Sequence, residues 1–273
     1  MRELQVENVA AALDCERAQR NAVTTFVEGL DQALGGGVPR GCTTEVLGPP
    51  GVGKTQFALG LAVNAQLPER CGGLGARSAL YLDAEGSFSV ERVRQIAQAA
   101  VRYARRAAGE SAAGEFTVER VLAGIKLMRV WSLAELLAYS HAIHRHLHEL
   151  PAEERPALIV VDSVAAHLRH SGLPSSAVVG FGQRMAAVAH DFNIAVVYIN
   201  HVTTRVISAG ETADAMTFLV PTLGEAWSHC AQNRISMWWN ADGQTVAALI
   251  KSPSRPNAAV PFQTTVAGVR GLR

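Results

Sequence analysis

The sequence predicts an α/β fold in which a mainly parallel, twisted sheet carries helices on both of its faces. Apolar runs of strand length alternate with helical stretches along the chain, and alternation of this kind builds parallel sheets. A glycine-rich segment at residues 48–55 also stands between a predicted strand and a predicted helix. A length of 273 residues is ordinary for one domain of this class and allows a large core.

The glycine-rich segment reads Gly-Pro-Pro-Gly-Val-Gly-Lys-Thr and fits the phosphate-loop pattern G-x-x-x-x-G-K-[ST] at every fixed position. Its glycines permit a backbone path that turns successive N–H groups toward an anion. Lys54 brings a positive charge to the β- and γ-phosphates, and Thr55 offers a hydroxyl to Mg²⁺. We therefore expect ATP and Mg²⁺ as cofactors. The residues expected to bind them here are Gly48, Pro49, Pro50, Gly51, Val52, Gly53, Lys54 and Thr55.

A chance glycine-rich turn is the alternative, and the flanking sequence argues against it. Residues 42–47 before the loop are rich in β-branched side chains, as expected of a strand. Residues 57–62 after it are mostly apolar, as expected of a buried helix. Such a helix would direct the positive end of its dipole at the phosphates.

Further strands and helices follow in alternation. Before the loop, a short helix containing Leu30 and Leu34 is ended by the glycines that follow it. After the loop, we expect strands over 79–82, 125–131, 157–161 and 194–199, helices over 90–107 and 133–150, and three more strands beyond residue 233. Helical spacing also covers residues 5–20. Residues 1–21 are therefore interpreted as an N-terminal helical or linker segment, and 22–273 as one nucleotide-binding core.

The composition excludes several classes of protein. A net charge of +1 provides no global basic field for nucleic acid, so any DNA contact must come from a local patch. Apolar stretches stay well short of the ~20 residues that span a membrane, and no signal peptide is apparent. The four cysteines are isolated from one another, which fits a reducing compartment and provides no zinc motif.

Acidic residues follow two of the apolar strands. Asp162 ends one apolar run, and a carboxylate at the carboxyl end of such a strand lies near the phosphates, so we expect it to hold Mg²⁺. Asp83 and Glu85 follow an earlier strand. Hydrolysis needs a group that orients or deprotonates water, and Glu85 is the better candidate because Gly86 leaves the site open. From the residues alone, a surface turn with solvated acids is an equal alternative.

Several motifs occur in a fixed order along the chain. They are LGGGVP at 34–39, GPPGVGKTQ at 48–56, YLDAEGSF at 81–88, VVDS at 160–163 and VYINHV at 197–202. In this order they resemble the RecA-type core of the eukaryotic strand-exchange recombinases and their paralogs, over about residues 22–273. The segments NHVTT at 200–204, VPTLGEAW at 220–227 and KSPS at 251–254 are most similar to the C-type paralog. The resemblance implies a RecA-like phosphate-loop ATPase core and adds Gln56 to the cofactor-binding residues.

The resemblance also implies a role for each matching position. Glu85 is expected to activate water and Lys54 to stabilise the phosphates, as the two catalytic residues. Arg92 is expected to stack on the adenine with its planar guanidinium. Asn200 and His201 occupy the position that senses the γ-phosphate. The family usually carries glutamine where His201 stands, so a group with a pH-dependent charge has replaced a neutral one.

Two segments, 167–178 and 203–222, resemble the DNA-facing loops of the family. Their main cations are Arg169 and Arg205, so few phosphates can be neutralised and DNA binding by the chain alone should be weak. Near the C-terminus, Pro253 resembles part of a cap over a neighbouring subunit's nucleotide. Lys251 in the same segment is expected either to reach the neighbour's phosphates or to lie in solvent.

The implied function is that of an ATP-binding, DNA-associated ATPase paralog of low turnover, acting in homologous recombination and double-strand break repair. The implied partners are single-stranded DNA or DNA junctions and other recombinase paralogs in a hetero-oligomer, with no membrane. The implied location is the nucleus, with the cytoplasm second. Two alternatives stay open. One is a nucleotide-stabilised scaffold with incidental hydrolysis, and the other is an autonomous strand-exchange recombinase, which the few cations and His201 disfavour.

Two further patterns are interpreted as structural. His141, His144 and His148 share one face of a helix at metal-ligand spacing, but no acidic third ligand is apparent, so a solvated face is expected. Trp238 and Trp239 are adjacent on a predicted strand. Since neighbours on a strand point to opposite faces, one of the two is expected to enter the core.

Overall fold

The fold was analysed in a computed structural model of the chain. It describes residues 21–75, 77–109, 115–169, 174–207 and 216–272. The helical segment predicted over 5–20 lies outside the described residues.

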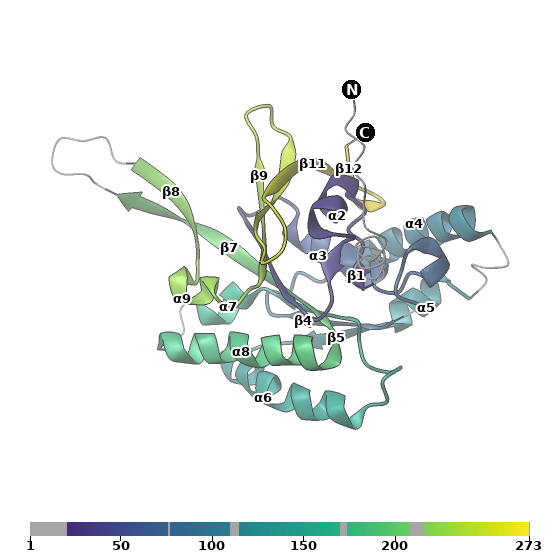
Figure 1. The fold of residues 1–273 in the computed structure, drawn as a ribbon, viewed down its shortest axis with the longest axis horizontal. Coiled ribbons are helices and arrows are strands. Elements are labelled where there is room, and N and C mark those ends of the chain that lie inside the picture. Colours follow the sequence, from purple (N-terminus) through teal and green to yellow (C-terminus); the bar gives the residue numbers. More distant parts are fainter. Residues whose placement is uncertain (1–20, 76, 110–114, 170–173, 208–215, 273) are drawn as a thin grey trace, which may run out of the picture.

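Within the described residues, six neighbouring strands run parallel and form the larger part of one sheet (Figure 1). In sheet order they are β9 (Asn233–Trp239), β3 (Thr43–Gly48), β7 (Ala195–Ile207), β6 (Leu158–Asp162), β4 (Ala79–Asp83) and β5 (Ile125–Arg129). The mainly parallel sheet predicted from the alternating pattern is confirmed.

Antiparallel strands extend this sheet beyond β9 and beside β7. They are β10 (Thr245–Lys251), β11 (Ala258–Thr265), β12 (Gly268–Gly271) and β8 (Met216–Pro221), while β1 (Ala22–Val23) and β2 (Val38–Pro39) form a separate pair. The prediction of three strands beyond residue 233 was wrong, because the fourth is short and bounded by glycines, which have low strand propensity. The strand predicted over 194–199 was too short, since β7 continues to Ile207 and pairs with β8 as a hairpin.

Helices cover both faces of the sheet, as predicted (Figure 1). Helices α3 (Lys54–Asn64), α4 (Val90–Ala108) and α5 (Val118–Ala123) pack in one apolar cluster, which α2 (Glu28–Leu34) and the short 3₁₀ helix η1 (Glu69–Cys71) join. Helices α6 (Leu133–Glu149), α7 (Val164–Leu168), α8 (Ser175–Phe192) and α9 (Gly224–Ser228) pack in the other. Helices α5, α7, α8 and α9 were not foreseen from the sequence.

Successive residues of the central strands enter different clusters. Tyr81 of β4 and Val160 of β6 belong to the cluster of α3, whereas Leu82 and Val161 belong to that of α8, and all four are fully buried. This period of two is the geometry of a strand covered on both faces. The strands are therefore held from both sides, which fixes the position of the residues at their ends.

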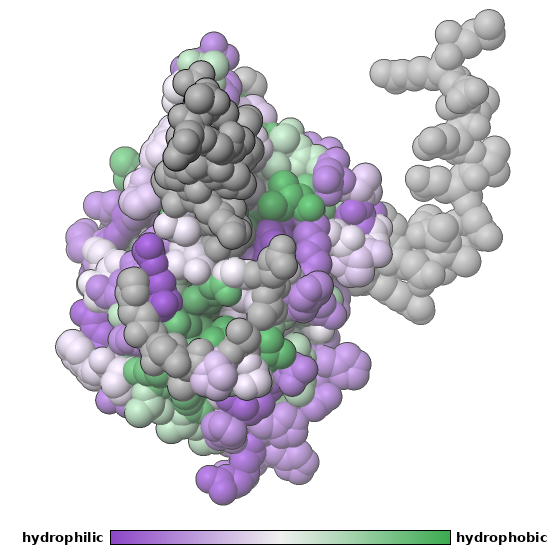
Figure 2. Space-filling model, turned by 90° about the vertical axis from the view of Figure 1, so that its left-hand side faces the viewer, coloured by the Kyte–Doolittle hydropathy of each residue, from purple (hydrophilic) through white to green (hydrophobic). Residues whose placement is uncertain are grey.

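The β7–β8 hairpin projects from one side of the molecule (Figure 1). Seen from that side, the surface mixes hydrophilic and apolar areas, and apolar side chains gather in a hollow near the centre of this face (Figure 2). Among the described residues, no helix combines the length and the apolar character that crossing a membrane requires.

Candidate functional site

The predicted site residues meet at the carboxyl edge of the parallel strands. Asp83 at the end of β4 is paired in register with Asp162 at the end of β6. Gly48 at the end of β3 is paired with His201 of β7, the neighbour of β6. Ligands of open α/β sheets bind at this edge.

The loop between β3 and α3 follows the path that its glycines were predicted to permit. Gly53 has a φ of 107° immediately before α3, in the region that favours glycine. Gly48 lies so close to β9 that a Cβ would come within 2.4 Å of the carbonyl oxygen of Met237. On the outer side, a Cβ on Gly51 would lie 3.8 Å from Cη2 of Trp239. Strand β9 therefore forms a wall of the loop, which the sequence did not reveal.

Lys54 is buried at the start of α3, with its ammonium inside the loop. Its Nζ donates to the carbonyl oxygens of Gly48 and Pro49, at 2.8 and 2.9 Å. Burial lowers the pKa of Lys54, and the negative charges of Asp162 and Glu85 oppose that shift. To bind a phosphate, the ammonium would exchange these two carbonyls for phosphate oxygens.

Asp162 has the properties of a cation-binding carboxylate. Its Oδ2 accepts a hydrogen bond of 2.5 Å from the hydroxyl of Tyr81, and the Thr55 hydroxyl lies within hydrogen-bonding reach. Its Oδ1 is buried and has no partner among the described residues. Burial raises the pKa of Asp162 above its ordinary value, partly offset by the bond from Tyr81. An unpaired buried oxygen beside a hydroxyl fits Mg²⁺, which binds hard oxygen ligands.

Glu85 stands at the rim of the same edge and is about one-third exposed, at 31% of its side chain. Its Oε1 accepts from the Ser163 hydroxyl and lies 2.6 Å from Nε2 of His201. The bond to His201, followed by that to Ser163, lowers the pKa of Glu85, while burial acts in the opposite direction. Glu85 is thus ionised and held by two neighbours, one of which is the predicted sensor.

Asp83, the other carboxylate of this motif, has a different task. Its Oδ1 accepts from the backbone N–H groups of Gly86 and Ser87, at 2.8 and 3.1 Å, and its Oδ2 accepts from Phe88 at 3.0 Å and from Arg129. It is fully buried. Asp83 therefore holds the turn that presents Glu85, and the role of Glu85 in water activation stays a prediction.

Asn200 does not face the phosphate loop. Its amide is fully buried, donates to Glu45 Oε1 at 2.7 Å and accepts from the backbone N–H of His201 at 2.8 Å. Its predicted contact with the nucleotide is therefore corrected to an indirect one through His201. Sequence reasoning passed over Glu45, although a single carboxylate inside an otherwise uncharged buried strand, as in β3, was a readable signal.

Arg92 lies in the first turn of α4, and each of its three guanidinium nitrogens donates to another residue of the chain. Its Nε donates to Gln56 Oε1 at 2.5 Å, and its Nη1 donates to the carbonyl of Val266 at 2.9 Å and to Gln95 at 3.0 Å. Its Nη2 donates to the carbonyl of Thr265 at 2.5 Å. This arrangement leaves the planar face of the guanidinium for stacking on a base. The adenine-binding role of Arg92 stays a prediction, and Gln56 acts by holding Arg92 in place.

Comparisons with known proteins identify the family. The family model described as Rad51 matches residues 16–272. The chain belongs to the Rad51 family. It is 36% identical to "DNA repair protein RAD51 homolog 3" of Cricetulus griseus over 259 residues, which is 91% of this chain and 68% of that protein. The protein of the same name in Dictyostelium discoideum is 34% identical over 264 residues, 94% of this chain and 67% of that protein.

A more distant relative completes the comparison. It is "DNA repair and recombination protein RadA" of Methanocorpusculum labreanum, 31% identical over 252 residues, 90% of this chain and 74% of that protein. Together these matches confirm the resemblance stated from the motifs.

In this Rad51-family chain, the described start of each predicted DNA-facing segment follows closely on a residue of the site, Ser163 or His201. Arg169 is exposed after α7, and its Nη2 donates to Thr203 Oγ1 of β7 at 3.4 Å. The main chain of Arg205 lies in β7, opposite Phe218, but its side chain lies outside the described residues. The described residues of the segment 203–222 belong mainly to the paired strands β7 and β8, which corrects that part of the prediction. DNA binding by both arginines stays a prediction.

Two residues of the predicted cap segment, Pro253 and Lys251, have different outcomes. Pro253 is exposed between β10 and β11, and its role toward a neighbouring subunit stays a prediction. Lys251 neither lies free in solvent nor points away from the chain. Its Nζ donates to the carbonyls of Ser228 and Ala231, at 2.8 and 2.6 Å, because the end of α9 leaves carbonyls without helical partners.

The patterns interpreted as structural also have defined places. The three histidines are exposed on α6, and Nε2 of His144 lies 2.9 Å from Oδ2 of Asp191. The expectation that a tryptophan of β9 enters the core was wrong. Trp238 is half-buried and Trp239 is 45% exposed. The buried face of β9 consists of the odd-numbered residues before them, and Trp239 stands at the end of the strand.

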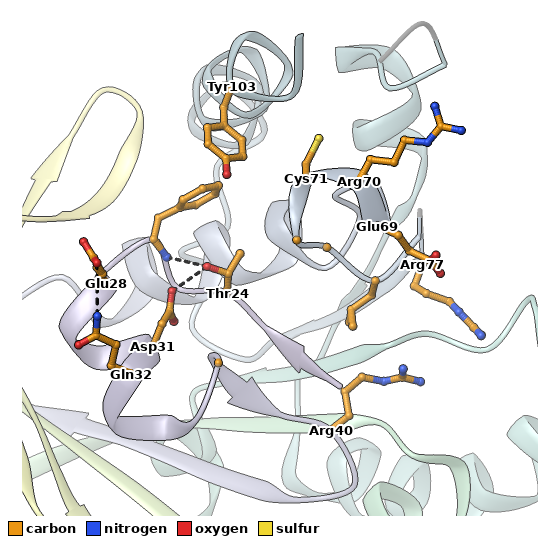
Figure 3. Close-up of a pocket in the computed structure, with 15 residues that line it drawn as sticks. Thr24, Glu28, Asp31, Gln32, Arg40, Glu69, Arg70, Cys71, Arg77 and Tyr103 are labelled. Atoms are coloured by element: carbon orange, nitrogen blue, oxygen red, sulfur yellow. Dashed lines mark hydrogen bonds between the residues drawn. The ribbon is translucent and has the colours of Figure 1, made fainter. Parts of the chain in front are cut away.

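A cavity of about 1080 Å³ lies away from this edge, between α2, η1 and α4 (Figure 3). Charged side chains of both signs line it, namely Glu28, Asp31, Glu69, Arg40, Arg70 and Arg77. Burial raises the pKa of Asp31, which accepts from the Thr24 hydroxyl at 2.7 Å. None of the predicted site residues lines this cavity, so it is separate from the phosphate-loop site.

Proposed function

We propose that this Rad51-family chain is an ATP-binding, DNA-associated ATPase paralog that acts in homologous recombination and double-strand break repair. The observation that carries the proposal is one edge of the sheet where a complete phosphate loop faces both Asp162 and Glu85. The printed names of its relatives, which describe DNA repair and recombination, support the process.

The residues present suffice for phosphoryl transfer to water. Loop N–H groups and Lys54 would bind the phosphates, while Thr55 and Asp162 would hold Mg²⁺, which when bound neutralises charge on the β- and γ-phosphates. Glu85 Oε1 would orient the attacking water and accept its proton. His201 shares that oxygen at 2.6 Å, so it positions the base and would respond first to the γ-phosphate.

One observation favours a second candidate, a nucleotide-stabilised scaffold. The bond from His201 lowers the pKa of Glu85, and a carboxylate of lower pKa is a weaker base. Slow turnover would follow while binding is retained. In this reading ATP fixes the conformation of an interface, and hydrolysis is incidental.

Turnover separates the two candidates. The chain, copurified with its partners, would be assayed for phosphate release with Mg²⁺ and ATP, with and without single-stranded DNA. Turnover stimulated by DNA supports the ATPase. Tight ATP binding without turnover in the assembled complex supports the scaffold. Absence of ATP binding contradicts both. Strand exchange by the chain alone would instead support an autonomous recombinase.

We further propose that the chain works in a nuclear hetero-oligomer with other recombinase paralogs, whose subunits complete its ATP site. Mass action requires ATP to tighten that association by the same factor by which the partner tightens ATP binding. Native mass spectrometry would identify the partners, and sedimentation of a pair with and without a non-hydrolysable analogue would measure the coupling. Equal association constants in both conditions would contradict this assembly.

DNA binding by the isolated chain should be weak and have a shallow salt dependence. Each phosphate neutralised on a single strand contributes a slope of about −0.7, and Arg169 with Arg205 provides roughly two or three contacts. Titrations of labelled single-stranded DNA or a DNA junction at several salt concentrations would measure the slope. A slope that corresponds to about six contacts would reveal a basic surface elsewhere.

A further inference from the structure

Glu45 is a fully buried carboxylate in the middle of β3, the strand that leads into the phosphate loop. A buried charge is tolerated only where it is paired and hydrogen-bonded. Its Oε2 accepts from Nε of Arg234, on the neighbouring strand β9, at 2.6 Å. This ion pair neutralises the charge and leaves Oε1 for other donors.

The Oε1 atom of Glu45 holds both ends of the β7–β8 hairpin. Asn200 Nδ2, at the point where β7 leaves the sheet, donates to it at 2.7 Å. Trp227 Nε1, in α9 just after the hairpin returns, donates to the same oxygen at 2.9 Å. One buried atom thus connects two segments of the hairpin base to the strand of the phosphate loop.

Three further hydrogen bonds complete the base of the hairpin. The carbonyl of His201 accepts from the backbone N–H of Thr222 at 3.0 Å and from its hydroxyl at 2.8 Å. The backbone N–H of His201 donates to Asn200 Oδ1 at 2.8 Å. His201 is therefore bonded through its ring to Glu85 and through its main chain to the hairpin base.

We propose that Glu45 is a positioning residue that couples the nucleotide-binding edge of the sheet to the base of the β7–β8 hairpin, so that the two move together. A ligand that draws the His201 ring away from Glu85 would move the main chain of His201. The hydrogen bonds from Asn200 and Trp227 to Glu45 would then transmit that movement to both strands of the hairpin. The proposal rests on the proposed ATP binding but does not require hydrolysis or DNA.

Substitution of Trp227 tests the proposal most directly, because it removes one donor to Glu45. Its indole packs against Tyr198 and Phe181, with ring centroids 5.1 and 6.2 Å away. Trp227→Phe keeps an aromatic ring in that cluster and removes one donor to Glu45. Tyr198→Phe is the matched control, since the buried Tyr198 hydroxyl has no partner among the described residues. Thr222→Val, at the half-buried hairpin base, is a second variant that removes the hydroxyl donor to His201 and leaves the aromatic cluster intact.

Amide hydrogen exchange with and without a non-hydrolysable Mg²⁺-ATP analogue tests the proposal. In the wild-type chain and in Tyr198→Phe, the analogue should slow exchange at the hairpin base by at least about fivefold, the lower end of ordinary allosteric coupling. In Trp227→Phe, and to a smaller degree in Thr222→Val, that response should fall below about twofold. Peptides of the phosphate loop should stay protected in all four proteins.

The outcomes distinguish this inference from the proposed function. A protected loop with no response at the wild-type hairpin base overturns the inference alone. So does a full response in both Trp227→Phe and Thr222→Val. If Trp227→Phe proves too unstable to assay, Thr222→Val, compared with the wild-type chain, decides the question. If the analogue does not protect the phosphate loop, ATP binding is contradicted, and this inference falls with it.

Discussion

Lys54, at the start of the helix that follows the parallel strand β3, and Lys251, at the end of the antiparallel strand β10, each donate to two carbonyl oxygens. Lys54 binds the carbonyls of its own loop, at the open edge of the parallel strands, where Asp162 and Glu85 counter the effect of burial on its pKa. Lys251 binds the carbonyls of Ser228 and Ala231. Burial and the positive charge of Arg234 both lower the pKa of Lys251.

Both residues are lysines, so residue type does not explain why one is expected to bind phosphate and the other to stabilise a turn. The direction of the neighbouring strands does. Parallel strands end together at one edge, so their terminal side chains converge on a ligand. Beyond β9 the strands alternate in direction, and Lys251 at the end of β10 stabilises the turn after α9. Lys54 is expected to exchange its carbonyls for phosphate, and Lys251 is expected to keep them.

The largest effect should come from Glu85→Gln. The amide keeps the size of the side chain but cannot accept a proton from water, so turnover should fall by about 100-fold or more, while ATP binding is retained. Phosphate release and calorimetry would measure the two quantities. Glu91→Gln, at an exposed carboxylate of α4, is the control. Turnover unchanged by Glu85→Gln would remove Glu85 from the mechanism.

Substituting the two lysines tests the comparison directly. Lys54→Ala removes the charge from the phosphates and should weaken ATP binding at least about tenfold, roughly 1.4 kcal/mol. Lys251→Ala should leave ATP affinity of the isolated chain unchanged. Calorimetric titration of ATP into both variants would measure these affinities. Equal loss of affinity in the two variants, or in neither, would break the distinction between the two parts of the sheet.

A smaller effect is expected on stability, and there substitution of Lys251 should matter. Lys251→Met keeps the length of the side chain but leaves two carbonyls without their donor, and we expect it to lower the free energy of unfolding by about 1–3 kcal/mol. For a chain of this size that is a fall of a few degrees, about 2–4 °C per kcal/mol, in the melting temperature. Unchanged melting would show that the two hydrogen bonds of Lys251 contribute nothing in solution.

The smallest effect concerns pH. Because His201 and Ser163 lower the pKa of folded Glu85, its carboxylate stabilises the fold above the unfolded pKa of about 4.3. That contribution disappears as the pH falls through the lower folded pKa. The stability difference between the wild-type chain and Glu85→Gln should therefore shrink as the pH falls below about 5. A difference that stays constant in denaturant titrations over this range would contradict the assigned bonds.

The site was most predictable where chemistry is local in sequence. The phosphate loop, Asp162 and Glu85 each follow an apolar strand, and the convergence of strand ends follows from the parallel pattern. The set of hydrogen bonds at Glu45 was not predictable, because its donors Asn200, Trp227 and Arg234 come from three distant segments. The β7–β8 hairpin was interpreted as a loop because its polar residues lack the clear alternation of a half-buried strand.

The ring of Trp239 lies beside Gly51, so its intrinsic fluorescence should report on the phosphate loop. Of the four tryptophans in the chain, Trp227 is fully buried, Trp238 is half-buried, Trp131 is 74% exposed and Trp239 is 45% exposed. Anionic ligand entering the loop would change the field and the hydration around Trp239 while leaving Trp227 in the core untouched. Intrinsic emission should therefore report loop occupancy without a label, and Trp239→Phe should abolish the ligand-dependent signal while preserving affinity measured by calorimetry.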